Sequence, residues 1–228
     1  MATRRTYGSY NDGCASAHAL DLVGDRWTMI VVRELLLGPQ RFTDLQRDVH
    51  GIGPGVLSQR LQALEADGVV QRRRAPGPGR VELYELTAWG YRLEDVNTAL
   101  SRWAVASPGL PRDADMSPDT VVLAMRAHVR PVPDLARTLR VLLHLTDSRV
   151  PGATPVTYVA HVGPRASRVE RLDAEPAGRP DAEVTASTRG WKACVIGGAA
   201  PDDVPEVQVA GDPAAVRHLL AATRLDAG

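Results

Sequence analysis

The chain of 228 residues has little of several features that would place it in a specialised class. It contains two cysteines, Cys14 and Cys194, which are too few for a disulfide framework and predict a reducing, cytoplasmic environment. No apolar run approaches the roughly 18 residues that span a bilayer. The N-terminal residues lack the apolar core of a secretory signal. We therefore expect neither a disulfide-stapled scaffold nor a membrane partner.

The charges balance, with 27 basic and 27 acidic residues. A net charge of zero argues against a chain that binds nucleic acid over its whole surface, but it permits a local basic patch. Residues 41–80 contain seven arginines and four acids, and four of these arginines fall within 72–80. From charge alone, a solvated hairpin and a nucleic-acid contact are equally good interpretations of this patch.

The composition is that of a globular chain, because 44% of the residues are hydrophobic and 24% are charged. The length suggests either one large domain or two domains of roughly 100–120 residues each. A stretch rich in proline and small residues at 107–118 is typical of a linker. We predict a first domain over 1–106 and a second over 119–228, with an α+β fold class for the whole.

The first half is predicted to be mostly helical. Short helices are expected at 16–23, at 25–37 with Asp25 as N-cap, and at 43–49 with Thr43 as N-cap. A stronger helix at 55–67 places Leu57, Leu61 and Leu64 on one stripe and ends at Gly68. Two short strands at 69–74 and 81–86 flank the basic Gly/Pro segment 75–80, and a long amphipathic helix capped by Thr87 follows at 88–106.

This order of elements predicts a winged helix-turn-helix. Two helices joined by a short glycine-containing turn can place the second helix in a major groove, and an arginine-tipped hairpin can reach the neighbouring phosphates. The motifs GDRW (24–27), RELLLGPQRFTDL (33–45) and YELTAWG (84–90) resemble the HxlR-type winged-helix transcriptional regulators, as does GIGPGVLSQRLQALEADGVVQR (51–72). The resemblance covers about residues 12–106 and implies a dimer that binds double-stranded DNA, with the terminal helices forming the two-fold interface.

The candidate DNA contacts follow from the helical wheel and from the resemblance. Small or amide-bearing residues lie opposite the leucine stripe of the 55–67 helix and suit base edges, whereas arginines at the turn and the wing suit phosphates. Arg60 flanks the stripe, so it is expected either to reach a phosphate or to pair with an acid. Thr43 could add phosphate binding to its capping role. The full set is Arg41, Thr43, Gly55, Ser58, Gln59, Arg60, Gln62, Arg73 and Arg80.

The second half is predicted to contain strands at 139–145, 156–162, 166–173 and 182–187, a helix at 188–197, and a strand, tight turn and helix over 206–224. The segments DAEVTASTRGWKACVIGG and VQVAGDPAAVRHLL resemble the C-terminal end of the sterol-carrier-protein type 2 fold. That resemblance implies an α/β sandwich enclosing an apolar tunnel, for which Leu143, Tyr158 and Trp191 are candidate lining residues. A filled core without a tunnel is the alternative.

No sequence motif indicates catalysis, a cofactor or a metal. HExxH, GxSxG and Walker patterns are absent, and the six histidines show no ligand spacing with cysteines or acids. Cys14 is either a small apolar residue or, as in some HxlR-type regulators, a thiol sensor, with His18 placed to lower its pKa. Cys194 is expected in the core.

We interpret the chain as a cytoplasmic, homodimeric regulator, a repressor rather than an activator, that binds a pseudo-palindromic operator. A hydrophobic small molecule in the second domain could modulate it. The alternatives are a lipid or small-molecule carrier whose winged helix serves for association, and a redox-sensing regulator acting through Cys14.

Overall fold

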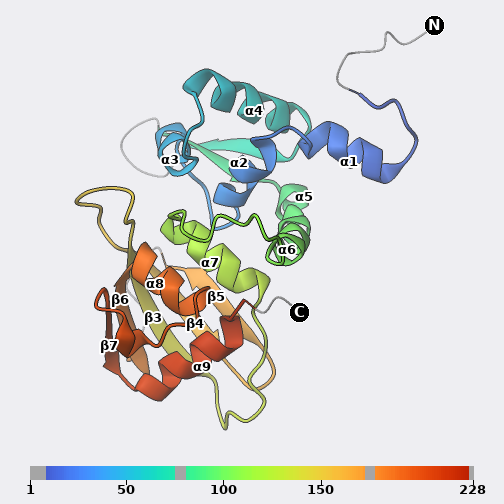
Figure 1. The fold of residues 1–228 in the computed structure, drawn as a ribbon. Coiled ribbons are helices and arrows are strands. Elements are labelled where there is room, and N and C mark those ends of the chain that lie inside the picture. Colours follow the sequence, from blue (N-terminus) through green and yellow to red (C-terminus); the bar gives the residue numbers. More distant parts are fainter. Residues whose placement is uncertain (1–8, 75–80, 173–177, 226–228) are drawn as a thin grey trace, which may run out of the picture. The chain divides into compact units, whose positions relative to one another are not determined.

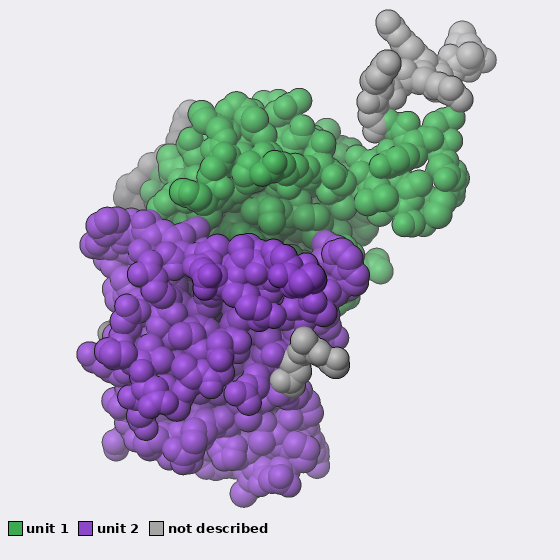
Figure 2. Space-filling model, viewed as in Figure 1, with its two compact units in different colours: residues 1–97 green, residues 98–228 purple. Residues whose placement is uncertain are grey.

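The computed structural model describes residues 9–74, 81–172 and 178–225 and divides into two compact units. Unit 1 comprises residues 1–97 and unit 2 comprises residues 98–228 (Figure 2). The boundary between the units falls within helix α6 (Leu93–Ala104). None of the helices in the described ranges has the length and apolar composition of a membrane span.

Unit 1 has the predicted order of helices and a two-stranded wing (Figure 1). Its elements are α1 (Ala15–Val23), α2 (Thr28–Leu35), α3 (Phe42–Asp48), α4 (Pro54–Ala66), β1 (Val70–Arg74), β2 (Glu82–Leu86) and α5 (Ala88–Tyr91), followed by α6. Strands β1 and β2 pair antiparallel, with Val70 opposite Leu86. Gln40 forms an isolated bridge with Tyr84, which ties the segment between α2 and α3 to the wing.

The core of unit 1 is built from the predicted apolar stripes. Leu57, Leu61 and Leu64 of α4 are at most 1% exposed, and α4 packs against α2 and β1. Val31 and Leu35 of α2 are fully buried beside them. Gly68 adopts a left-handed backbone with φ of +71° just after α4, so it ends the helix where the sequence predicted.

Two of the predicted helix starts are wrong. Helix α2 begins at Thr28 with Trp27 at the N-cap position, so Asp25 does not cap it. Helix α3 begins at Phe42 with Arg41 at the N-cap position, which places Thr43 inside the first turn. The backbone carbonyl of Arg41 accepts the N–H groups of Asp44 and Leu45. The N-cap therefore lies two residues before Thr43.

The long helix predicted at 88–106 is interrupted. The N–H of Arg92 bonds to the carbonyl of Trp89 three residues back, a tighter turn than an α-helix makes, and this turn separates α5 from α6. Thr87 caps α5 as predicted, because its hydroxyl accepts the N–H of Gly90 at 3.0 Å.

In its described residues, unit 2 has a five-stranded mixed sheet with three α-helices packed on it (Figure 1). The strands are β3 (Leu139–Thr146), β4 (Val156–Val162), β5 (Ser167–Arg171), β6 (Ala182–Ser187) and β7 (Val207–Gly211). Their order is β5-β4-β3-β6-β7, with only β3 and β6 parallel. The helices are α7 (Pro118–Ala127), α8 (Thr188–Val195) and α9 (Pro213–Thr223), with a short 3₁₀ helix, η1 (Pro201–Asp203).

The alternation predicted for 139–145 holds in β3. Val141, Leu143 and Leu145 are fully buried, and Leu143 lies opposite Tyr158 on β4 and Val184 on β6. Trp191 of α8 and Leu219 of α9 are fully buried and cover this face. Helix α7 was not predicted as a separate element, since its first residue, Pro118, was placed at the end of the expected linker.

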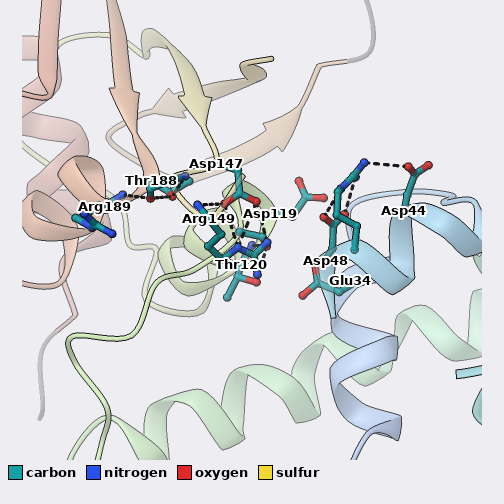
Figure 3. A network of polar contacts seen from close by, with 12 residues as sticks. Glu34, Asp44, Asp48, Asp119, Thr120, Asp147, Arg149, Thr188 and Arg189 are labelled. Atoms are coloured by element: carbon teal, nitrogen blue, oxygen red, sulfur yellow. Dashed lines mark hydrogen bonds and ion pairs between the residues drawn. The ribbon is translucent and has the colours of Figure 1, made fainter. Parts of the chain in front are cut away.

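Polar contacts fasten the helices and the loop after β3 to the sheet. Asp119 of α7 accepts hydrogen bonds from the Tyr158 hydroxyl at 2.5 Å and from Nη1 of Arg171 at 2.8 Å. Asp147 pairs with Arg149 at 2.8 Å, and Thr188 exchanges hydrogen bonds with Ser148 (Figure 3). These buried groups are satisfied by one another, as burial of polar groups requires.

Gly90 provides a test of packing in unit 1. A Cβ on Gly90 would lie 2.1 Å from the backbone oxygen of Val69, whereas a Cβ on Gly55 would meet nothing within 4 Å. We expect Gly90→Ala to lower the free energy of unfolding by about 1–3 kcal/mol through overpacking. Gly55→Ala is the matched control and should be neutral or slightly stabilising, because alanine favours a helix. Urea unfolding followed by circular dichroism measures both, and equal stability of the two variants would contradict this packing.

Candidate nucleic-acid interface

Helix α4 presents a polar face opposite its buried leucine stripe. Gly55, Gln59 and Gln62 are exposed and Ser58 is half-buried. Nε2 of Gln62 lies 3.4 Å from Oγ of Ser58, a weak contact that leaves the Gln62 carbonyl oxygen available. The side chain of Gln59 has no hydrogen-bond partner among the described residues. The structure therefore brings the predicted base-reading residues together on one exposed face.

The segment joining α3 to α4 is short and turns through glycine. Val49 ends α3 with its N–H bonded to the carbonyl of Leu45, and Gly53 occupies the N-cap position of α4. Ile52 is 7% exposed, so the turn is anchored in the core of unit 1. Arg41 and Thr43, at the start of α3, are both exposed. In the described part of unit 1, Arg41 has no carboxylate partner.

Ion pairs divide the candidate arginines into two kinds. Arg60 pairs with Asp25, which is the acid-pairing alternative that the sequence left open. Arg73 pairs with Glu85 at 3.2 Å, and Arg72 pairs with Glu65 at 3.1 Å. Arg80 lies outside the described residues. Arg74 is exposed and has no acid partner among the residues that the structure describes, so it joins Arg41 as an uncompensated cation.

Arg74 was not singled out from the sequence. The triple arginine 72–74 showed that alternate side chains must point to different faces of the strand, but it could not show which of them meet acids. The pairing register supplies that information, because it places Glu82 and Glu85 across the wing from the arginines. The signal in the sequence was the Glu/Leu alternation of 82–86, which becomes informative only once the register is known.

Outside the winged helix, the predicted tunnel residues lie in the core of unit 2. Leu143, Tyr158 and Trp191 are all fully buried. None of them lines the cavity found among the described residues of unit 2, which lies between β7 and α9. The Nε1–H of Trp191 donates to the sulfur of Met125 at 3.4 Å, so the Trp191 side chain packs against helix α7.

The histidines of the sheet stay apart. His144 lies opposite Thr157 and contacts its hydroxyl at 3.1 Å, while His161 lies opposite Arg140. Burial, together with the charge of Arg168, lowers the pKa of His161 below its ordinary value. Among the described residues, no group of three or more His, Cys, Asp or Glu side chains could hold a metal ion.

The two cysteines have opposite environments. Cys14 is exposed at the N-cap position of α1, where the nearby backbone N–H groups of Ala17 and Ser16 lower the pKa of its thiol. His18 is not a cause of this shift, contrary to expectation. Cys194 is buried, and burial raises the pKa of its thiol to about 11.

The arrangement of three helices, a short turn and a two-stranded wing defines a winged helix-turn-helix protein. Residues 22–108 match the model of the HxlR-like helix-turn-helix family. The chain is 39% identical over 87 residues to the HTH-type transcriptional regulator YvaP of Bacillus subtilis, covering 38% of this chain and 80% of YvaP. It is 37% identical over 95 residues to the HTH-type transcriptional regulator YtfH of Escherichia coli, covering 41% of this chain and 75% of YtfH.

The chain therefore belongs to the HxlR-like helix-turn-helix family through its N-terminal part. Among solved structures, the reduced form of the transcriptional regulator YodB from B. subtilis aligns at 30% identity with a TM-score of 0.39, covering 42% of this chain and 97% of YodB. The match to the family model ends at residue 108, so residues 109–228 lie outside it.

Alkylation should distinguish the two thiols. Because the thiolate is the reactive form, the lowered pKa of Cys14 predicts that its reaction with iodoacetamide reaches half-maximal rate at a pH below 9.0, the ordinary thiol value. Cys194, with a pKa near 11 and little exposure, should react much more slowly than Cys14 in the folded protein. Mass spectrometry of peptides after timed labelling measures both rates. Labelling of Cys194 at a higher rate than Cys14 in the folded protein would contradict these environments.

Proposed function

We propose that the protein is a DNA-binding transcriptional regulator that acts as a homodimer on a pseudo-palindromic operator. We assign it the role of a repressor rather than an activator. The observation that carries this proposal is the exposed polar face of α4 beside a wing and a turn with uncompensated arginines. A helix of this kind fits the major groove, where glutamine amides can read base edges. Membership of a family whose relatives are transcriptional regulators supports the same function.

In this proposal, the DNA-contacting residues have separate roles. Gln59, Gln62 and Ser58 face base edges, and Gly55 allows the backbone to approach the DNA closely. Arg41, Thr43 and Arg80 contact phosphates, and Arg74 joins them. Arg60 and Arg73 are held by Asp25 and Glu85, so they contribute by positioning α4 and the wing or by sharing their charge with a phosphate.

The proposed domain organisation assigns residues 1–106 to DNA binding, 107–118 to a linker and 119–228 to a sterol-carrier-like domain. The strand, Asp212 cap and helix at β7 and α9, together with the sheet-and-helix layering of unit 2, support this assignment. A regulator of this design would work in the cytoplasm. A carrier whose winged helix serves only for association is less well supported, because the relatives are regulators.

A second proposed mode of control is a thiol switch at Cys14. Its support is the exposed position of the thiol at a helix N-cap and the lowered pKa. Oxidation of the thiol by a peroxide, which is itself reduced, would give a sulfenic acid at the start of α1, a helix expected at the dimer interface.

The proposed dimer rests on an exposed apolar stripe along α5 and α6. Trp89, Val96, Leu100 and Trp103 are 50%, 44%, 47% and 79% exposed. Along α6, Leu93, Val96, Leu100 and Trp103 are spaced three, four and three residues apart, the a/d pattern of helices that pair along one seam, and Trp89 lies before them in α5. Such an uncovered apolar patch marks an interface, and two-fold pairing would also present two α4 helices to successive half-sites.

Two substitutions in α4 and α3 should separate reading from anchoring. Gln59→Ala should lose discrimination at one base position per half-site, by about 1–3 kcal/mol. Arg41→Ala should weaken binding to all sequences alike and reduce the salt slope by about one per subunit. Fluorescence anisotropy on sequences selected from a random library, at several salt concentrations, measures both. If the wild-type protein selects no sequence at low salt, the proposed function is wrong.

Two carboxylates introduced into the apolar stripe should dissociate the dimer. Val96→Glu with Leu100→Glu puts two carboxylates on each partner at the proposed seam, where burial of unpaired charge is costly. We expect a dimer mass for the wild type and a monomer mass for the variant by light scattering at micromolar concentration. Val56→Glu, at a valine 38% exposed on α4, is the matched control and should stay dimeric. A wild-type monomer would reject the dimer.

A further inference from the structure

A cavity of about 500 Å³ lies in unit 2 between the edge strand β7 and helix α9. Its size falls within the 300–1,000 Å³ typical of sites for small molecules. Helix α9 contributes one stripe of side chains, Pro213, Val216, Arg217, Leu220 and Ala221, and Arg224 follows directly after the helix. The segment 198–202 and Cys194 complete the wall.

The cavity exists because the edge of the sheet is incompletely covered. Val209 lies opposite the fully buried Val184, so it points to the same, helix-covered face of the sheet. Val207 and Val209 nevertheless remain partly exposed, as does Leu220 across from them on α9. The inner wall is therefore apolar and unfilled, and exposed apolar area of this kind gains free energy when a ligand covers it.

The charged residues of the lining are two arginines and one carboxylate. Arg217, Arg224 and Asp202 are all exposed, which places them at the rim. Within the described ranges, neither arginine is ion-paired with Asp202 or with any other acid. The guanidinium of Arg224 lies against Gly198, where a Cβ would approach its Nη2 to 2.8 Å. Two free cations against one carboxylate leave the rim with an excess positive charge.

We propose that this cavity binds an amphipathic organic anion, with an apolar body between β7 and α9 and a single carboxylate at Arg217 and Arg224. Guanidinium groups favour carboxylates because their N–H donors match the two oxygens. Cys194 contributes an uncharged thiol to the wall, in keeping with an apolar body. The cavity differs from the tunnel that the sequence predicted, since Leu143, Tyr158 and Trp191 lie outside its lining.

Such an anion would be the effector of the regulator, and only this regulatory role rests on the proposed function. A ligand changes DNA binding only if it has different affinities for two states of the protein. Binding to the cavity can be measured without DNA, so the two proposals are tested separately.

The test is calorimetric titration of the full chain with three probes that share one apolar body: octanoate, 1-octanol and octyltrimethylammonium. We expect octanoate to bind with a Kd below about 1 mM, because its methylene groups are removed from water in the apolar part of the cavity. Octanol should bind at least fivefold more weakly and the cation more weakly still. Absence of octanoate binding, or equal affinities for the acid and the alcohol, would overturn the proposal.

Variants locate the binding. Arg217→Gln with Arg224→Gln should weaken octanoate at least fivefold and leave octanol unchanged, since each exposed pair is worth a few-fold. Arg179→Gln, at another exposed arginine of unit 2, is the control and should bind like wild type. Val209→Phe should fill the cavity and abolish binding of both probes, while Ala210→Phe, on the opposite face of β7, should not. Undiminished binding by the double arginine variant would overturn the proposal.

Melting temperatures show whether each variant folds. If Val209→Phe does not fold, the arginine variants still test the proposal, because their substitutions are at exposed positions. DNA binding is measured on the same samples. Octanoate binding without any DNA binding would sustain the cavity and remove the regulator, whereas DNA binding without octanoate binding would do the reverse.

Discussion

Leu57, Leu61 and Leu64 are almost inaccessible to solvent, and their burial against α2 and β1 fixes which face of α4 points outward. Covering each leucine is worth roughly 1.5–3 kcal/mol, so rotating the helix by one residue would expose leucine and bury polar side chains at a large cost. The positions of Gln59 and Gln62 on the open face are a consequence of this constraint. The core of unit 1 thus holds the polar face of α4 in place before any DNA is present.

The arginines of unit 1 differ in whether they form ion pairs. Acids on neighbouring elements hold Arg60, Arg72 and Arg73, which orients these long side chains and neutralises much of their field. The zero net charge is therefore compatible with nucleic-acid binding, since what attracts a phosphate is the small number of cations that lack a partner. Arg41 and Arg74 are such cations on the described surface of unit 1.

Incomplete burial marks the surfaces that are left for other molecules. The stripe from Trp89 to Trp103 is one, and its four-three spacing suits a second helix of the same kind. The other is the helix-facing side of β7, where an edge strand has a neighbour on one side only and α9 does not fill the gap. In both places the sequence supplies apolar residues that the fold of a single chain does not bury.

The sequence by itself determined the helical stripes, the strand alternation, the wing and the family, because these depend on spacing along the chain and on long ordered motifs. It also determined which residues of α4 face away from the leucines. The sequence did not predict the helix starts at Thr28 and Phe42, because neither helix begins with a side-chain cap. Only the tertiary structure decided the pairing of Arg60 with Asp25, the partner of each wing arginine and the position of the cavity. These depend on contacts between residues distant in sequence, and on how well large side chains such as Trp191 and Tyr158 fill the space between sheet and helices.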